Sequence, residues 1–276
     1  FIREGTEVKV ADLIRGIVIQ SGNDASVAMA EFIAGDEQAF ADIMNQVAQK
    51  LGMTRTQFKN ATGLPNEGHY TTAKDLSLLA RALIRDFPEH YKVYKEKYFS
   101  YNDIRQANRN SLLWRDDAVD GMKTGHTQAA GFCLVASAEK KELRLISVVM
   151  GATSERSRST ESQKLINYGF RYFESVKLYD GLESLKRVKV WGGLHESLDV
   201  GIEAPVQLTI PNGARGALAA EVTLDPVIKA PVGHGQTLGL LRISLEGETL
   251  LERPVVALNA VDEAGFVSSL IDEVSL

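Results

Sequence analysis

The sequence is poor in cysteine, has no excess of positive charge and shows no metal-binding spacing of its histidines. There is one cysteine, Cys133, so no disulfide can form within the chain and cysteine usage does not indicate a compartment. The 31 basic residues are outnumbered by 36 acidic ones, and the net charge of −5 leaves no basic footprint for a nucleic-acid partner. The five histidines show no ligand spacing such as His-Glu-x-x-His, so we expect no metal site and no cofactor.

Long hydrophobic runs and a recognisable start are also missing. No run of apolar residues is long enough to span a bilayer. The N-terminal segment has no signal-peptide pattern, and we interpret the chain as part of a longer precursor. Its 276 residues suffice for one large domain or two ordinary ones, and contents of 44% hydrophobic and 24% charged residues are ordinary for a globular protein.

The first part of the chain has helical periodicity. In residues 36–52 apolar side chains recur at helical spacing between acidic residues at the start and a glycine at the end. In residues 71–87, Thr72 and Asp75 form a Thr-x-x-Asp capping signal ahead of another apolar stripe. A further helix is predicted over residues 23–35, just after a Ser-Gly-Asn loop.

The middle of the chain changes its period from helix to strand. Residues 132–136 and 143–150 are rich in β-branched side chains, and a polar turn over 137–142 separates them. This pattern predicts an antiparallel hairpin. A helix follows at roughly residues 160–175, with its apolar side chains on one side. The first domain is therefore of mixed α+β class, a helical cluster followed by a sheet and a helix that packs on it.

After about residue 178 the helical pattern stops. Short runs of alternating polarity begin at residues 187, 206, 220, 238 and 255. Turn signals such as Pro-Asn-Gly separate them, and together they predict an all-β sandwich over residues 178–276, after a first domain over 1–177. The tail, residues 266–276, fits equally well the start of an amphipathic helix and a closing strand of the sandwich.

Two polar motifs far apart in the sequence could carry chemistry. Lys-Thr-Gly at 123–125 lies at the entrance of a predicted strand, where the lysine adds positive charge, the hydroxyl can bind a carboxylate and the glycine leaves room along the strand edge. Ser-Gly-Asn at 21–23 lies in a loop between helices, where a serine can relay a proton and an asparagine can hold an amide. Taken alone, the first motif is better explained as a solvated lysine before a turn glycine, and the second as a helix N-cap.

The combination of the two motifs resembles the low-molecular-mass penicillin-binding proteins, the serine-type D-alanyl-D-alanine carboxypeptidases of the penicillin-binding protein 5 and 6 kind. Ser-Gly-Asn, in place of Ser-Asp-Asn, agrees with the carboxypeptidases and differs from class A β-lactamases. The resemblance implies a transpeptidase/β-lactamase-like first domain, followed by the all-β domain that this family places between the catalytic domain and the membrane. The residues that carry it are 13–32, 82–99, 104–114, 119–127, 133–138 and 168–174.

The resemblance implies catalytic roles for three residues. Ser21 is expected to pass a proton to the leaving amine. Asn23 is expected to hold the peptide carbonyl of the substrate or a neighbouring lysine of the site. Lys123 is expected to supply positive potential and to orient Ser21.

The resemblance also implies a substrate-binding group at the end of the predicted strand. Thr124 is expected to bind the terminal carboxylate of D-alanine, and the backbone N–H of His126, just past Gly125, is expected to complete an oxyanion hole. Arg158 and Arg109 match arginines that the family holds in or near the site, Arg158 towards the carboxylate end. Each of these two arginines is explained equally well as a surface charge.

The family nucleophile is the serine of a Ser-x-x-Lys motif at a helix start, several tens of residues before Ser-Gly-Asn. Only twenty residues precede Ser21, so we expect this motif to lie outside the chain, and the chain by itself to be inactive. Ser137 and Lys140 also spell Ser-x-x-Lys. They fall at the predicted hairpin turn, where residues i and i+3 do not share a helix face, and Ser137 is therefore rejected as the nucleophile.

The function implied for the full protein is hydrolysis of peptidoglycan stem peptides that end in D-Ala-D-Ala, with release of D-alanine through an acyl-enzyme that β-lactams trap. The implied location is the periplasm, on the outer face of the cytoplasmic membrane, after export by a signal peptide and through a C-terminal amphipathic helix outside the chain. Two other functions stay open, a non-catalytic scaffold of the same fold that binds cell-wall peptide and a related hydrolase such as a β-lactamase.

Overall fold

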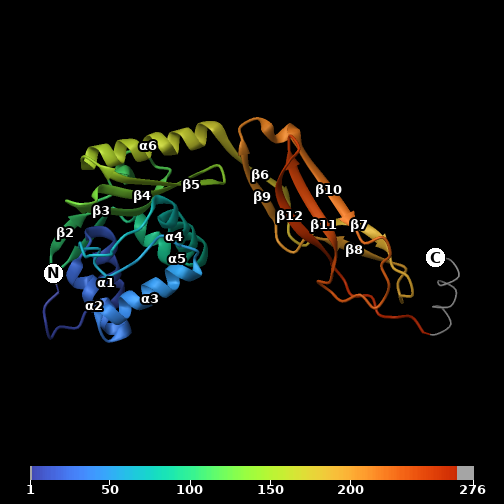
Figure 1. The fold of residues 1–276 in the computed structure, drawn as a ribbon, viewed down its shortest axis with the longest axis horizontal. Helices are drawn as coiled ribbons and strands as arrows, with labels where there is room; N and C mark the ends of the chain where they lie inside the picture. Colours follow the sequence, from blue (N-terminus) through green and yellow to red (C-terminus); the bar gives the residue numbers. More distant parts are fainter. Residues whose placement is uncertain (1, 266–276) are drawn as a thin grey trace. The chain divides into compact units, whose positions relative to one another are not determined.

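The computed structural model describes residues 2–265, in which a helix-rich part precedes an all-β part (Figure 1). Two units result, one ending at Arg171 and the other beginning at Tyr172. This boundary lies a few residues before the one expected from the sequence. The reason is that strand β6 (Phe173–Tyr179) follows helix α6 (Glu155–Tyr172) without a loop and pairs with strand β9 (Val206–Pro211) of the second unit.

Helices form most of the first unit and surround its sheet (Figure 1). Besides α6, its α-helices are α1 (Val10–Arg15), α2 (Asn23–Ala34), α3 (Glu37–Lys50), α4 (Ala73–Asp86) and α5 (Pro88–Tyr91). Shorter turns are the π-helix η1 (Gly16–Gln20) and the 3-10 helices η2 (Lys92–Lys95) and η3 (Ser111–Trp114). The loop between η1 and α2 carries the Ser-Gly-Asn motif, as the sequence predicts.

The predicted helices over residues 36–52 and 71–87 are confirmed as α3 and α4. Asp36 caps α3 by accepting a hydrogen bond from the backbone N–H of Ala39 at 2.7 Å. Thr72 caps α4 in the same way, accepting from the N–H of Asp75 at 3.1 Å. The carboxylate of Asp75 binds the preceding loop, through the N–H of Arg55 at 2.8 Å. This residue therefore ties a loop to the helix start.

The sheet of the first unit is antiparallel, with strand order β3-β4-β5. Its strands are β3 (Val119–Thr127), β4 (Gly131–Lys140) and β5 (Leu143–Ala152), and a separate two-stranded hairpin joins β1 (Tyr98–Tyr101) to β2 (Ile104–Ala107). The predicted hairpin is confirmed, but its turn is shorter than expected. Only Lys141 and Glu142 form it, both with positive φ, the conformation of a two-residue turn that matches strand twist.

Helices cover both faces of this sheet. Figure 1 shows α6 along one face and α4 and α5 on the other. On the α6 side, Ile166 is 1% exposed and packs with Leu134 and Ala136 of β4. On the other side, Ala80 of α4 packs with Tyr91 and Met122. With both faces covered, the open edge of β3 becomes the part of the sheet that can meet a ligand, since no second strand of the described residues pairs with it.

The second unit is built from two antiparallel sheets around one core, which confirms the predicted sandwich. The larger sheet has the order β10-β11-β12-β8-β7, and β6 and β9 form the smaller one. The remaining elements are β7 (Ser184–Lys189), β8 (Ser197–Gly201), β10 (Leu218–Leu224), β11 (Thr237–Leu245), β12 (Glu248–Ala257) and the 3-10 helix η4 (Ala214–Ala217). The two predictions for the tail fall on residues 266–276, outside the described part of the chain.

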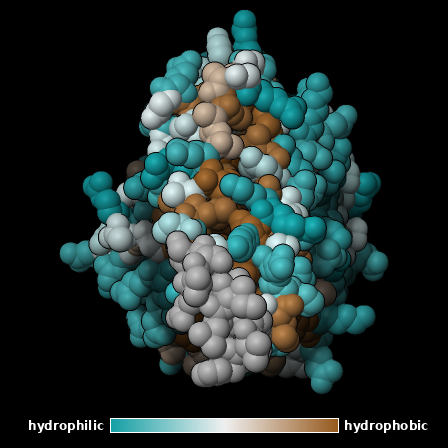
Figure 2. All heavy atoms as spheres, turned by 90° about the vertical axis from the view of Figure 1, so that its right-hand side faces the viewer, coloured by the Kyte–Doolittle hydropathy of each residue, from teal (hydrophilic) through white to brown (hydrophobic). Residues whose placement is uncertain are grey.

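The surface of the second unit carries scattered apolar side chains. Figure 2 shows the face on the right-hand side of Figure 1, where apolar atoms lie in patches bordered by hydrophilic ones. Among the described residues of this unit, Leu182 and Leu194 are the most exposed large apolar side chains, at 62% and 63%. Over the described residues, no helix combines the length and apolar character needed to cross a membrane.

Candidate active site

One cleft of about 530 Å³ in the first unit is lined by all eight residues that the sequence singled out. These residues are Ser21, Asn23, Arg109, Lys123, Thr124, Gly125, His126 and Arg158. They come from the η1–α2 loop, the segment after β2, strand β3 and the first turn of α6. The fold thus brings together residues from four separate parts of the sequence.

Ser21 lies where η1 ends, in a left-handed conformation with φ 58° and ψ 46°. The turn is held by backbone hydrogen bonds from Ser21 to Ile17 and from Gly22 to Gly16, each at 3.1 Å. A non-glycine residue in this region costs free energy, and such residues are concentrated at functional sites. The turn directs the Ser21 hydroxyl towards β3, where it accepts a hydrogen bond from the Lys123 ammonium.

Asn23 is the first residue of α2, and its exposed side chain makes no hydrogen bond within the described residues. The N-cap position is taken by Gly22, which has no side chain to offer. The explanation of Asn23 as an N-cap is therefore wrong, because it stands one position inside the helix. Its carboxamide is left open to the cleft.

Lys123 is largely buried in β3, and its Nζ donates to Ser21 Oγ and, at 3.0 Å, to the backbone oxygen of Thr124. Burial, together with the positive charges of Arg109 and Arg158, lowers the pKa of Lys123 to about 8. Within residues 2–265 no carboxylate forms an ion pair with it. Lys123 is therefore a hydrogen-bond donor to Ser21 whose ammonium group loses its proton more readily than that of an ordinary lysine.

The residues that follow Lys123 line the open edge of β3. Thr124 is 9% exposed, whereas Gly125 and His126 are exposed. The His126 ring stacks on Phe132 with centroids 3.9 Å apart and an angle of 25° between planes, so it forms a fixed wall. A Cβ at Gly125 would make ordinary contact with Cys133 at 3.8 Å. Packing against β4 would therefore tolerate a larger residue at position 125. We attribute the glycine to the cleft, which it lines.

The two arginines occupy different environments in the cleft. The Arg158 side chain is only 4% exposed, donates to the backbone oxygen of Gly125 at 3.2 Å and pairs with Glu155 at 3.3 Å. Burial lowers the pKa of its guanidinium from the usual value. It is therefore no solvated surface charge. Arg109 is exposed at the cleft rim, and its backbone N–H donates to Ile19 at 3.3 Å.

The charge of the cleft suits an anionic group at one end. Three cationic side chains line it against one carboxylate, that of Glu155. Cations in a partly buried cleft attract a carboxylate far more strongly than on an open surface. The described residues include no group of three or more His, Cys, Asp or Glu side chains placed to hold a metal ion.

One wall of the cleft was not anticipated from the sequence. Residues 61–64 form it, and Asn60 holds them by accepting from the N–H of Gly63 at 2.7 Å and donating to the backbone oxygen of Leu64 at 2.9 Å. The run Asn-Ala-Thr-Gly-Leu-Pro over 60–65 is a turn signal that indicates a loop. Nothing in it indicates which cavity the loop borders. Ile17, Ser26, Thr127 and Glu155 also line the cleft.

Ser137 and Lys140 were expected in the turn predicted over 137–142, but they lie within strand β4. Residues three apart on a strand point to opposite faces. Ser137 is fully buried, accepting from Arg144 at 2.8 Å, whereas Lys140 is exposed. The pair therefore lacks the geometry in which a lysine activates a serine.

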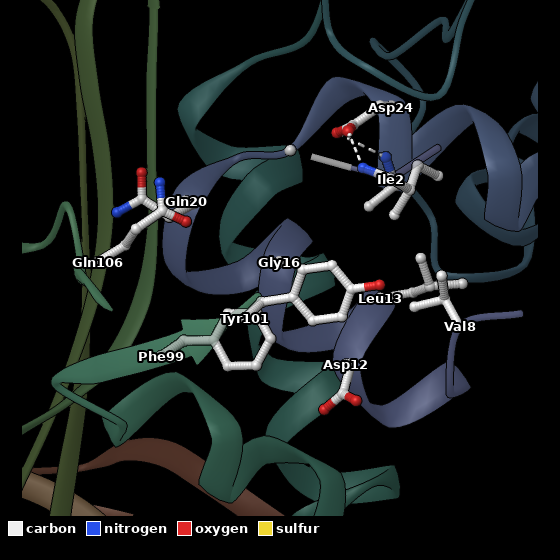
Figure 3. Close-up of a pocket in the computed structure, with 12 residues that line it drawn as sticks. Ile2, Val8, Asp12, Leu13, Gly16, Gln20, Asp24, Phe99, Tyr101 and Gln106 are labelled. Carbon is white, nitrogen blue, oxygen red and sulfur yellow. Dashed lines mark hydrogen bonds between the residues drawn. The ribbon is translucent and has the colours of Figure 1, made fainter. Parts of the chain in front are cut away.

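A second hollow lies behind the Ser-Gly-Asn loop, and Figure 3 shows the residues around it. It is small, about 30 Å³, and mainly apolar, with Leu13 and Val8 on one side and the rings of Phe99 and Tyr101 on another. The carboxylate of Asp24 accepts from the backbone N–H of Ile2 at 2.9 Å. This second hollow is not lined by Lys123 and Ser21, the hydrogen-bonded pair of the cleft.

Comparison with known proteins matches both units. The family model described as D-alanyl-D-alanine carboxypeptidase matches residues 1–154, and that of the penicillin-binding protein 5 C-terminal domain matches residues 173–263. D-alanyl-D-alanine carboxypeptidase DacC of Escherichia coli is 44% identical over 278 residues, covering 100% of this chain and 70% of its own length.

Solved structures agree with the sequence matches. Penicillin-binding protein 5 from Haemophilus influenzae has a TM-score of 0.87 at 40% identity, covering 95% of this chain and 77% of its own. Penicillin-binding protein D2 from Listeria monocytogenes, in its ampicillin-bound form, has a TM-score of 0.56 at 34% identity over 59% of this chain and 68% of its own. The chain therefore belongs to the D-alanyl-D-alanine carboxypeptidase family.

Proposed function

We propose that the protein is a serine-type D-alanyl-D-alanine carboxypeptidase that removes the terminal D-alanine of peptidoglycan stem peptides through an acyl-enzyme. The observation that carries the proposal is the hydrogen bond from Lys123 to Ser21 beside the open edge of β3. One cleft thus combines a proton relay, a cationic end for a carboxylate and a strand edge for an extended peptide. Membership of the family supports the same reaction.

In the proposed complex the stem peptide lies along β3 and extends the sheet by one strand. The Thr124 hydroxyl binds the terminal carboxylate, aided by the three cations of the cleft. The open carboxamide of Asn23 holds the peptide carbonyl, since it has no other partner in the described residues. The backbone N–H of His126 is one donor of the proposed oxyanion hole.

The proposed reaction has two steps. As a serine hydroxyl oxygen bonds to the carbonyl carbon of the penultimate residue, its proton passes to the lysine of the Ser-x-x-Lys motif. The C–N bond to the last D-alanine then breaks, and Ser21 passes a proton to the leaving amine. Lys123 replaces the proton of Ser21 through their hydrogen bond, for which its pKa of about 8 is suitable, and regains a proton from the motif lysine, so that no net charge is left. Water then cleaves the ester, which restores the serine and releases the shortened peptide.

β-Lactams are proposed to follow the first step alone. Attack opens the four-membered ring by breaking its C–N bond, but the nitrogen stays tethered to the acyl group and does not leave. The acyl-enzyme therefore keeps the cleft blocked against water. The ampicillin-bound form of the similar Listeria protein supports this part of the proposal.

The attacking serine is proposed to lie outside these 276 residues. Ser137 begins the only Ser-x-x-Lys in the sequence, and the strand geometry of that pair is unsuitable. We also propose that the protein acts in the periplasm at the surface of the cytoplasmic membrane. The location rests on family resemblance.

Incubation with benzylpenicillin followed by intact mass measurement and peptide mapping tests the proposal. We expect one adduct, on a serine outside the 276 residues, and release of D-alanine from a D-Ala-D-Ala peptide. Penicilloic acid, whose ring is already open, is the matched control and is expected to give no adduct. An adduct on Ser137 or Ser21 contradicts the proposed mechanism.

The same assays separate the other functions. A non-catalytic scaffold retains the peptide but gives neither adduct nor D-alanine. A β-lactamase consumes penicillin rapidly and leaves the D-Ala-D-Ala peptide intact. Either result overturns the proposal.

Replacing Thr124 by Val removes the hydroxyl and keeps the side-chain shape. If this hydroxyl binds the carboxylate, kcat/KM for the D-Ala-D-Ala peptide falls by about 10- to 100-fold, the cost of one lost charge-assisted hydrogen bond. Thr223→Val, on an exposed position of β10, is the control and leaves kcat/KM unchanged. A Thr124→Val protein with the parent rate would exclude this role.

A further inference from the structure

The segment that follows β2, residues 107–110, is hydrogen-bonded both to η1 and to β3. It contains Asn108 and Asn110, which are 6% and 1% exposed. Buried asparagines are uncommon and are kept where their amides are fully used. Arg109 stands between them and reaches the rim of the cleft.

On one side the segment is bound to η1, the helix that ends at Ser21. Gln20 donates from Nε2 to the backbone oxygen of Ala107 at 2.6 Å, and the backbone N–H of Arg109 donates to Ile19 at 3.3 Å. Figure 3 labels Gln20, at the end of η1, and Gln106 of β2 among the residues around the second hollow. The conformation that presents Ser21 thus rests against this segment.

On the other side the segment is bound to β3. Asn110 donates from Nδ2 to the backbone oxygen of Gly121 at 3.0 Å, two residues before Lys123. Its Oδ1 accepts from the N–H of Leu112 at 3.2 Å and so caps η3. Asn108 supports this geometry by accepting from the N–H of Asn110 at 2.9 Å.

Gly121 is held from its opposite side as well. A Cβ on this residue would lie 2.4 Å from Tyr91 Oη, so the tyrosine packs directly against its Cα. The Tyr91 hydroxyl donates to Asp120 at 2.8 Å. Gly121 is therefore fixed between Tyr91 and Asn110, and Lys123 extends from a fixed point of the strand.

We propose that Asn110 is a positioning residue that joins the η1 turn to β3 and so holds Ser21 and Lys123 within hydrogen-bonding reach. Two of its hydrogen bonds have distinct purposes. The bond to Leu112 caps a helix, and the bond to Gly121 joins the segment to β3. The consequence for catalysis rests on the proposed function, whereas the consequence for the Lys123 environment does not.

The test compares Asn110→Ser with Asn110→Ala. A serine keeps a capping acceptor for Leu112 but is too short to reach Gly121, whereas alanine removes both bonds. Asn45→Ser is the matched control, because Asn45 brackets the backbone of Phe58 in the same way, with both bonds at 2.8 Å, on a helix outside the cleft.

The readout is the titration of Lys123, followed by trace acetylation across pH and quantified by mass spectrometry. The charged groups that act on Lys123 are Arg109 and Arg158. Loss of the hydrogen bond between Asn110 and Gly121, called the bridge below, is expected to admit water and to move Arg109 away from Lys123. Both Asn110 variants should therefore raise the titration midpoint of Lys123 by about half a pH unit or more. Asn45→Ser is expected to leave it at the parent position. Unchanged Lys123 titration in both Asn110 variants, with a lower melting temperature alone, overturns the proposal.

A second variant keeps the test decisive if the Asn110 variants do not fold. Gln20→Leu cuts the bond at the other end of the segment, at a half-buried position where folding is expected to survive. Gln20→Leu is also expected to raise the titration midpoint of Lys123. A midpoint equal to that of the parent overturns the proposal.

A kinetic measurement then connects the bridge to the proposed function. In Asn110→Ser the rate of penicillin acylation is expected to fall about tenfold or more, since small misplacements of reacting groups are costly. If the parent protein forms no adduct, the proposed function fails while the Lys123 titration still tests the bridge. Acylation at the parent rate, together with unchanged titration, counts against a positioning role.

Discussion

At the scale of single residues, the site depends on a lysine held in unfavourable surroundings. Lys123 is largely buried, its pKa is lowered to about 8, and both arginines near it are positively charged. Burial of a cation among cations destabilises the folded state, and nothing in the packing of β3 requires an amine there. The amine is explained by its hydrogen bond to Ser21 in the cleft.

Replacing Lys123 by Met is expected to abolish turnover and to stabilise the fold at neutral pH. The folded protein releases the Lys123 proton near pH 8, whereas the unfolded chain keeps it up to about pH 10.5, so this group makes the parent more stable as pH rises between those values. Below pH 8 Lys123 is protonated in both states, and the full destabilisation caused by its burial is present. After allowing for lost hydrogen bonds, the free energy of unfolding should rise by about 1–2 kcal/mol at pH 7 in Lys123→Met.

Chemical denaturation from pH 6 to 11 measures this effect. The difference between Lys123→Met and the parent should shrink as the pH passes from 8 to 10.5. Lys164→Met is the control, because Lys164 is 67% exposed on α6, and its effect should stay within about 0.5 kcal/mol. A variant less stable than the parent at pH 7 would show that Lys123 is not destabilising.

At the scale of elements, the position of β3 is determined by what lies against Gly121. The helical segments α5 and η2 present Tyr91 and Tyr94, whose rings stack with centroids 5.4 Å apart. A Cβ on Gly121 would meet Tyr91 Oη at 2.4 Å and Tyr94 Cβ at 3.2 Å. Neither ring can move freely, because one is hydrogen-bonded to Asp120 and each packs on the other.

Gly121→Ala is therefore expected to lower the free energy of unfolding by about 1–3 kcal/mol through overpacking, and to reduce acylation because β3 shifts. Tyr91→Phe removes the closest atom, so the alanine should cost less in that background, with a coupling of about 0.5 kcal/mol or more. Gly216→Ala, where a Cβ meets nothing within 4 Å, is the control. If Gly121→Ala lowers the free energy of unfolding equally in the parent and in Tyr91→Phe, the contact with the Tyr91 hydroxyl is excluded as the cause.

At the scale of the whole molecule, each unit has a hydrophobic core of its own. In the second unit the core includes residues of β8, β9, β11 and β12, among them Leu241, Val200 and Val255, each fully buried. The buried clusters around Leu134 and Tyr91 belong to the first unit. Units with separate cores are expected to unfold as separate cooperative transitions.

Leu241→Ala tests this expectation. Removing a fully buried leucine side chain should destabilise the second unit by about 2–5 kcal/mol. Calorimetry should show one transition moved down while penicillin acylation at low temperature stays at the parent rate. Leu250→Ala, at a position 38% exposed on β12, is the control and should move neither. A single transition that shifts as a whole would contradict independent unfolding.

Local signals in the sequence were sufficient for part of the fold. The caps and apolar stripes of α3 and α4 lie within one segment each, so both helices were predicted with bounds close to those observed. Strand β8 was missed because its five residues include Asp199 and Gly201, which strands disfavour. Strand β6 was partly assigned to the helix that precedes it. The polar residues at the end of β4 imitated a longer turn than the two-residue one observed.

The sequence by itself determined which residue types form the site, because two short motifs with unusual chemistry and a family resemblance can be read without coordinates. Only the tertiary structure decided that Ser21 and Lys123 meet across 102 residues, that Arg158 is buried, and that Asn110 binds β3 at Gly121. The physical reason is that desolvation, pKa and hydrogen-bonding reach depend on the packing of the entire unit. A motif carries information about its own neighbours along the chain, and those three properties arise from neighbours in space.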